Sequence, residues 1–115
     1  MDLQKLLDTF GCVPTFIGSK IYDFDYDDSD NMDTLTFCFC NIQEKAKFKS
    51  VNKVSFKFKG IKIKYVNLNN FNYDFNLVEN CKIDLEGNEI EVKGENETGF
   101  KFNFKEFIGV EFPMW

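Results

Sequence analysis

The chain has 115 residues, and its 19 acidic residues outnumber its 14 basic ones, all of them lysine, giving a formal net charge of −5. The length suits a single domain, residues 1–115, and the 43% hydrophobic content excludes an intrinsically disordered chain. No apolar run approaches the roughly 18 residues of a membrane-spanning helix. The first residues also lack the basic start and apolar stretch of a secretory signal. We therefore expect a cytoplasmic protein with no membrane partner.

The first predicted element is a helix over residues 2–10. Its apolar residues lie at helical spacing and form one stripe: Leu3, Leu6, Leu7 and Phe10. Asp2 can cap the start of this helix, and Gly11 can end it. A helix this short is not stable alone, so we expect it to dock on the rest of the domain.

The spacing of apolar residues then changes to two, which is typical of β-strands. Strands are predicted over residues 20–27, 34–40, 53–59, 81–86, 89–94, 100–104 and 106–112. In the first strand aromatic residues alternate with aspartates, so the aromatic side chains are expected to face the core. This aromatic set is Tyr22, Phe24 and Tyr26. The strand over 34–40 is apolar on both faces, which favours an interior position in a sheet.

The connections between these strands predict the fold class. Gly60 is either a bulge within one strand or a tight connection between two. Gly87 and Asn88 together form a two-residue turn signal. Tight turns without intervening helical patterns favour antiparallel pairing. We therefore predict a mainly β fold, an antiparallel β-sandwich or strongly curved sheet of about six to eight strands. It combines a short N-terminal helix with a β body over residues 19–112.

The sequence contains no histidine, which removes the usual general base and the commonest transition-metal ligand. The cysteines at positions 12, 38, 40 and 81 include no Cys-x-x-Cys pair, and no Gly-rich phosphate loop is present. We therefore expect a protein that is not an enzyme, with no catalytic residues, no metal site and no cofactor. Its thiols are expected to be free and buried.

The densest charged feature is a run of carboxylates: Asp23, Asp25, Asp27, Asp28, Asp30 and Asp33. A calcium loop requires glycine at its sixth position and glutamate at its twelfth, and counting from Asp23 these positions hold Asp28 and Thr34. The run is therefore either a solvated surface or a docking surface for a cationic partner. A second acidic patch is predicted at Glu86, Glu89 and Glu91.

Lysines are concentrated in residues 44–64, where eight lysines and one glutamate give a net charge of +7. A module that binds nucleic acid through this stretch would use Lys57, Lys59, Lys62 and Lys64. The strand alternation turns the neighbouring phenylalanines away from the lysines, which leaves bases without a stacking surface. Direct binding of nucleic acid is therefore not expected, although such a module remains an alternative.

The order of several short motifs resembles that of a family of small bacterial immunity proteins. Val13-Pro14-Thr15-Phe16 is similar to the Trp-Pro-Ser-Phe-His-Asp entry of that family, with Ile17 and Gly18 in place of its His and Asp. The other matching runs are residues 54–61 (Val-Ser-Phe-Lys-Phe-Lys-Gly-Ile), 69–72 (Asn-Asn-Phe-Asn) and 98–104 (Thr-Gly-Phe-Lys-Phe-Asn-Phe), followed by Pro113.

The family is encoded beside polymorphic toxins, including toxins of contact-dependent growth inhibition. The resemblance implies a non-enzymatic inhibitor that binds the catalytic domain of one cognate toxin. Many such toxins are basic nucleases, and an acidic inhibitor would cover their substrate cleft by charge complementarity. The two acidic patches are then the expected contacts. A phage or mobile-element inhibitor of a host nuclease is an alternative with the same chemistry and a different partner.

Overall fold

A computed structural model describes residues 3–29, 33–47, 50–68 and 77–113 of the chain. Within them it contains one α-helix and eight strands, all paired antiparallel in two sheets. The prediction of a mainly β fold with a short N-terminal helix is confirmed. The elements are α1 (Gln4–Phe10), β1 (Lys20–Asp27), β2 (Thr34–Cys40), β3 (Lys53–Lys59), β4 (Lys62–Asn67), β5 (Val78–Asp84), β6 (Glu89–Gly94), η1 (Glu95–Glu97), β7 (Gly99–Asn103) and β8 (Glu106–Glu111).

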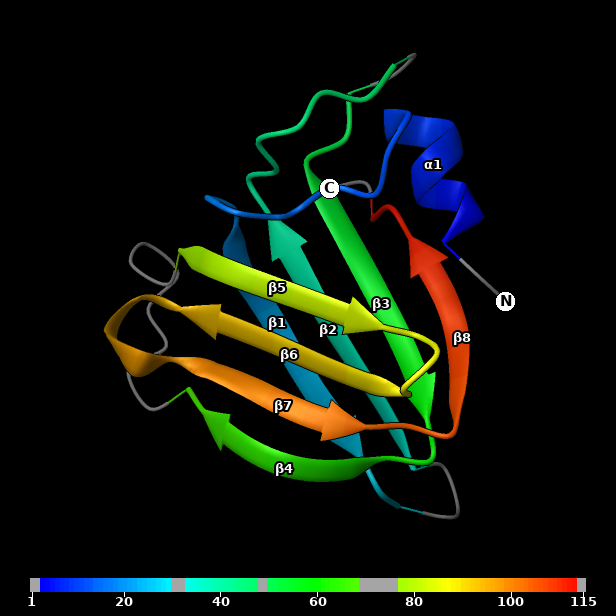
Figure 1. Ribbon diagram of the computed structural model, residues 1–115, viewed down its shortest axis with the longest axis vertical. Helices are drawn as coiled ribbons and strands as arrows, with labels where there is room; N and C mark the ends of the chain where they lie inside the picture. Colours follow the sequence, from blue (N-terminus) through cyan, green and yellow to red (C-terminus); the bar gives the residue numbers. More distant parts are fainter. Residues whose placement is uncertain (1–2, 30–32, 48–49, 69–76, 114–115) are drawn as a thin grey trace.

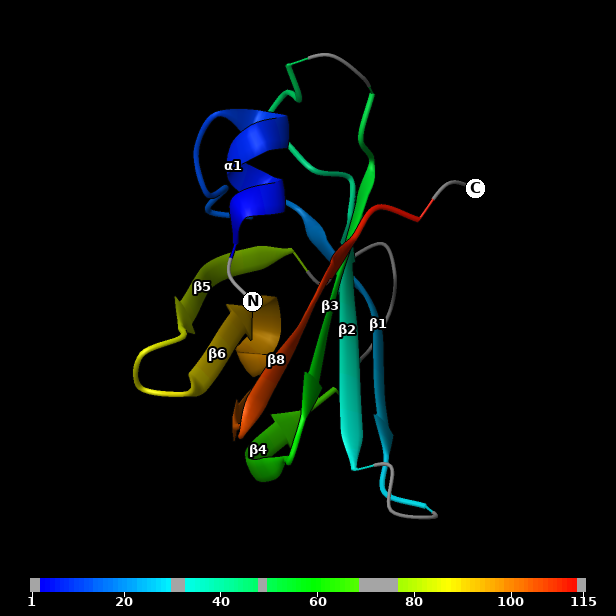
Figure 2. The same cartoon turned by 90° about the vertical axis from the view of Figure 1, so that its right-hand side faces the viewer.

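The two sheets form the layers of a sandwich. The first has the strand order β1-β2-β3-β8, and the second has the order β4-β7-β6-β5. Figure 1 shows the second sheet in front of the first, with its strands running obliquely across them. Figure 2 shows the two layers edge-on, with α1 on the side of the second sheet. The strand over 34–40 is interior, as its two apolar faces predict.

Phenylalanines from both sheets fill the space between the layers. Phe37 of β2 is fully buried, and its ring centroid lies 5.0 Å from those of Phe56 on β3 and Phe100 on β7. Rings at this distance interact favourably beyond the effect of their buried area. The alternation of β2, β3 and β7 therefore supplies one aromatic core that joins the two sheets.

Helix α1 begins after Leu3, which makes no side-chain capping hydrogen bond, and it ends at Gly11 in the left-handed conformation. Asp2, the predicted cap, lies outside the described residues. Leu6 and Phe10 are buried, whereas Leu7 keeps 38% of its surface exposed. The apolar stripe of the helix is thus wider than the face that the core covers. Among the described residues, no helix has the length and apolar character that spanning a bilayer requires.

A bulge in β1 corrects the predicted aromatic face. The pairing with β2 shifts between Ile21 and Asp23. Ile21, Phe24 and Tyr26 consequently pack on the core, and the Tyr22 ring instead lies 4.6 Å from the Nζ atom of Lys53. An inserted residue reverses the alternation that precedes it, and neither Tyr22 nor its neighbours signal this locally.

Two connections differ from a simple strand pattern. Of the two alternatives predicted for Gly60, the structure shows the tight connection and not the bulge. With φ at 72°, Gly60 carries the chain from β3 in the first sheet to β4 in the second. The predicted two-residue turn is wrong, because Asp84 pairs with Glu89 across a loop of four residues. The Asp84 carboxylate accepts a hydrogen bond from the Gly87 N–H at 2.8 Å, which stabilises this longer loop.

Candidate functional site

The acidic residues of β1 lie along one edge of the first sheet. Asp23 pairs with Cys38 and Asp25 with Thr36, so both carboxylates point away from the core, and both are exposed. On the same face, Lys20 pairs with Cys40, two positions along β2 from the Cys38 partner of Asp23, and the other lysines belong to β3, whose backbone is two strands away, or about 10 Å. Within the described part of the chain no ion pair involves either aspartate. This edge therefore carries unneutralised negative charge.

The remaining aspartates of the run differ in their surroundings. The Asp27 carboxylate accepts hydrogen bonds from the Ser29 N–H (3.0 Å) and Ser29 hydroxyl (2.6 Å), which lower the pKa of Asp27. Asp28 is exposed at the end of β1. Asp30 lies outside the described residues, so its predicted role as a contact has no structural counterpart here.

Asp33 is part of the framework. Its carboxylate accepts a hydrogen bond from the Ile61 N–H at 3.2 Å and another from the Tyr26 hydroxyl at 3.0 Å. Its backbone carbonyl accepts a third from the Gly60 N–H at 2.9 Å. The hydrogen bond to Asp33 is the main cause of a raised pKa at Tyr26. Asp33 thus holds the end of β1 against the connection between the sheets, which leaves its carboxylate less available to a partner.

The second acidic patch does not adjoin the first. Glu89 and Glu91 pair with Asn103 and Lys101 on the outer face of the second sheet, on the opposite side of the sandwich from Asp23. Glu86 is exposed in the loop between β5 and β6. One flat partner surface cannot contact both patches at once, so the structure separates what the sequence suggested as joint contacts.

Cations and hydroxyls within the chain engage two of these glutamates. The Glu89 carboxylate lies 3.8 Å from the Lys64 Nζ atom and 3.7 Å from that of Lys101. The Glu91 carboxylate accepts a hydrogen bond from the Tyr65 hydroxyl at 2.9 Å. Burial, followed by the hydrogen bond and the negative charge of Glu91, raises the pKa of Tyr65 to about 12. This patch is therefore partly neutralised, unlike the edge of β1.

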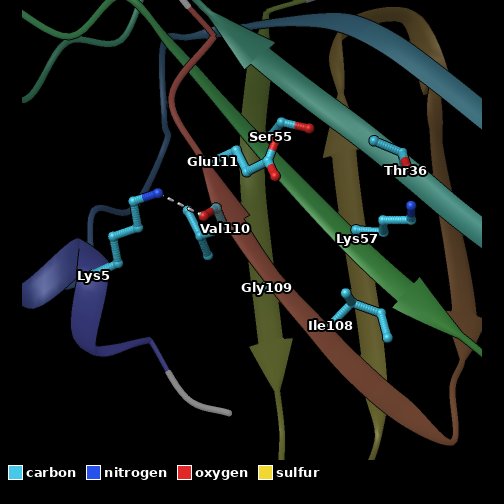
Figure 3. Close-up of a pocket in the computed structure, with 8 residues that line it drawn as sticks. All are labelled: Lys5, Thr36, Ser55, Lys57, Ile108, Gly109, Val110 and Glu111. Atoms are coloured by element: carbon cyan, nitrogen blue, oxygen red, sulfur yellow. Dashed lines mark hydrogen bonds between the residues drawn. The ribbon is translucent and has the colours of Figure 1, made fainter.

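A hollow of about 570 Å³ opens on the outer face of the first sheet (Figure 3). It exists because Gly109 stands opposite Lys57 across the β3–β8 pair, and the nearby positions hold the small side chains of Thr36 and Ser55. At one end the Lys5 Nζ atom donates a hydrogen bond to the Val110 carbonyl at 3.1 Å. Sequence reasoning missed this hollow. The available signal was a glycine inside a strand pattern, which often marks a bulge or a close approach.

The structure separates the lysines that were considered for nucleic-acid binding. Lys57 and Lys59 lie on the outer face of the first sheet. Lys62 and Lys64 belong to β4, where Lys64 pairs with Glu89 on the outer face of the second sheet. The four side chains therefore do not form one basic surface.

The four cysteines are free, as expected, but only one of them is buried. Burial, followed by the nearby Cys40 and Asp23 charges, raises the pKa of the Cys38 thiol to about 12. Burial alone raises the pKa of Cys81 to about 12. Cys12 is exposed, which corrects the expectation for that position. Among the described residues, no three Cys, Asp or Glu side chains are grouped as a metal ion requires.

No family model matches the chain, and no curated protein or solved structure is significantly similar to it.

Proposed function

We propose that the protein is an immunity protein that binds and neutralises a cognate bacterial toxin domain through the acidic edge of β1. The observation that carries this proposal is the exposed pair Asp23 and Asp25, which have no cationic partner among the described residues. The motif resemblance described above supports the same class of function.

The charge arrangement favours a partner with a basic surface. Like charges along one strand repel each other in the free protein, and a cationic surface relieves that repulsion on binding. The toxin's basic substrate cleft provides such a surface if the toxin is a nuclease. Of the two predicted patches, the edge of β1 fits this role better, because Glu89 and Glu91 are already engaged by Lys64, Lys101 and Tyr65.

The test is binding to the toxin domain encoded beside the gene, measured as affinity and association rate. The double variant Asp23→Asn/Asp25→Asn is expected to lower the association rate about tenfold at low salt, because electrostatic steering is lost. The matched control Glu79→Gln/Glu97→Gln removes the same charge from exposed positions in β5 and η1, outside the row of β1 aspartates, and should change little.

A third variant, Glu86→Gln/Glu91→Gln, tests the opposite face. If that variant alone weakens the complex, the binding surface is the second sheet and our assignment of the edge is wrong. If the wild-type protein binds no neighbouring toxin, the proposed function itself fails.

A further inference from the structure

The outer face of the first sheet carries opposite charges at matching levels of β1 and β3. Asp25 pairs with Thr36, and Thr36 pairs with Lys57, so the three residues form one row across the sheet. The next row toward the end of β1 has the same pattern: Asp27, Thr34 and Lys59. The middle member of each row is neutral.

These opposite charges do not neutralise each other within the molecule. Strands β1 and β3 are separated by β2, so the backbones of the aspartate and the lysine of a row lie about 10 Å apart. An ion pair requires a distance near 4 Å. The ion pairs of the described residues lie instead on the second sheet, around Glu89. The face therefore presents a negative stripe on β1 and a positive stripe on β3, and the positive stripe is bordered on β8 by Glu106, which pairs with Lys59, and by Glu111, which pairs with Ser55.

We propose that this face docks onto the same face of a second copy of the chain, with a twofold axis parallel to β2. A rotation of 180° about such an axis exchanges left and right across β2 and keeps each row at its level. Asp25 of one copy then lies opposite Lys57 of the other, and Asp27 opposite Lys59. Each contact occurs twice, as twofold symmetry requires.

Of the two remaining rows, one adds a favourable contact and the other brings two lysines to the same level. Asp23 comes to lie opposite the Ser55 hydroxyl, which can donate to a carboxylate. Lys20 comes opposite Lys53, but Lys53 is only 8% exposed and its Nζ atom lies under the Tyr22 ring. A twofold axis perpendicular to β2 would instead place aspartate on aspartate, so the charge pattern selects the parallel axis.

The expected association is weak and sensitive to salt. Three overlapping strands of seven residues cover roughly 14 Å by 23 Å, an area of about 320 Å². This area is well below the ~800 Å² that each partner buries in a standard interface. Attraction between exposed charges is also strongly screened by salt. The dimer covers Asp23 and Asp25, so it would compete with any partner that binds this edge, although the inference does not depend on such a partner.

The experiment measures the molar mass of the full chain by sedimentation and light scattering over a range of concentrations. The wild-type protein is expected to associate reversibly at low ionic strength and to dissociate at high ionic strength. Asp25→Lys and Lys57→Asp each place like charges opposite each other at two symmetric positions. Each should weaken the association about tenfold or more.

Mixing the two variants makes the test specific. In the mixed dimer, the new lysine faces the new aspartate and Asp25 faces Lys57, so association should return to about the wild-type level. The charge-matched controls Glu86→Lys, in the loop between β5 and β6, and Lys93→Asp, on β6, should leave the association unchanged. Circular dichroism establishes that each variant is folded. A wild-type protein that stays monomeric at every concentration, or a mixture that shows no recovery, would overturn the proposal.

Discussion

The carboxylate of Asp33 accepts a hydrogen bond at 3.2 Å from the backbone N–H of Ile61, a residue 28 positions later in the chain. Ile61 follows the connection that carries the chain from the first sheet to the second. The Tyr26 hydroxyl donates to the same carboxylate at 3.0 Å. One side chain of the acidic run thus links the end of β1 to the crossing point between the layers.

Replacing Asp33 with alanine should destabilise the fold. The change leaves two part-buried donors without their acceptor, and alanine tolerates the φ of 41° poorly. We expect a loss of roughly 2–4 kcal/mol in the free energy of unfolding, measured by urea denaturation. Asp33→Asn should lose less than half of that, because asparagine keeps an acceptor oxygen and adopts positive φ readily. A loss at Asp28→Ala equal to that at Asp33→Ala would contradict this role.

The central ring of the core predicts a larger effect. Phe37 contacts aromatic rings from both sheets, including Phe56 and Phe100 at 5.0 Å. Phe37→Ala should reduce the free energy of unfolding by about 3–5 kcal/mol, which is a large part of the total for a domain of this size. Phe37→Leu fills more of the space and should lose less. Equal effects of the two variants in thermal unfolding would mean that ring packing is not the cause.

The raised pKa of Tyr65 predicts a loss of stability at alkaline pH. The pKa is about 12 in the folded protein against 10.0 for the free side chain. Between these values the unfolded chain releases the proton and the folded chain retains it. The contribution of Tyr65 is therefore complete below pH 10 and declines as pH rises toward 12.

Phenolate absorbance during an alkaline titration measures this shift. Glu91→Gln should move the Tyr65 transition to lower pH, because the carboxylate charge and its hydrogen bond both favour the protonated phenol. The transition should remain above that of a free tyrosine, since burial is the largest cause. If Glu91→Gln titrates identically to the wild type, Glu91 does not contribute to the raised pKa of Tyr65.

Cysteine reactivity should follow burial. Cys38 and Cys81 have thiol pKa values raised to about 12, so little reactive thiolate forms at neutral pH. Cys12 is exposed and should react first with a maleimide, giving one rapid modification by mass spectrometry. The variant Cys12→Ser should lose that rapid modification, and the other thiols should react fully only after denaturation. Rapid labelling of Cys38 in the native protein would contradict its burial.

Local alternation was sufficient to predict most of the strands, because side chains of a β-strand point to alternate faces whatever the strand pairs with. The elements over 20–27, 34–40 and 53–59 therefore appear at their expected positions. The strand expected over 81–86 is an exception, because β5 spans Val78–Asp84. The bulge at Tyr22 and the longer loop before Glu89 depend on pairing with another strand, and sequence alternation carries no record of that register.

The sequence predicted which residues of the candidate site are exposed, but it predicted only part of their arrangement on the surface. The exposure of Asp23, Asp25 and Asp28 follows from alternation and polarity alone. The framework role of Asp33 required a partner from the inter-sheet connection, which no local pattern specifies. The hollow beside Gly109 likewise arises where β8 joins β3.

The sequence by itself determined that this molecule is a β domain with a Phe-rich interior. It also determined that the molecule has no imidazole and that its acidic residues and its lysines lie in separate runs. The tertiary structure alone decided how those runs face one another. Strand order places Asp25 and Lys57 in one row of the first sheet and puts Glu89 on the opposite side of the sandwich. The reason is that neighbours in a sheet are set by hydrogen bonding between strands distant in the chain, whereas charge and periodicity are properties of each segment separately.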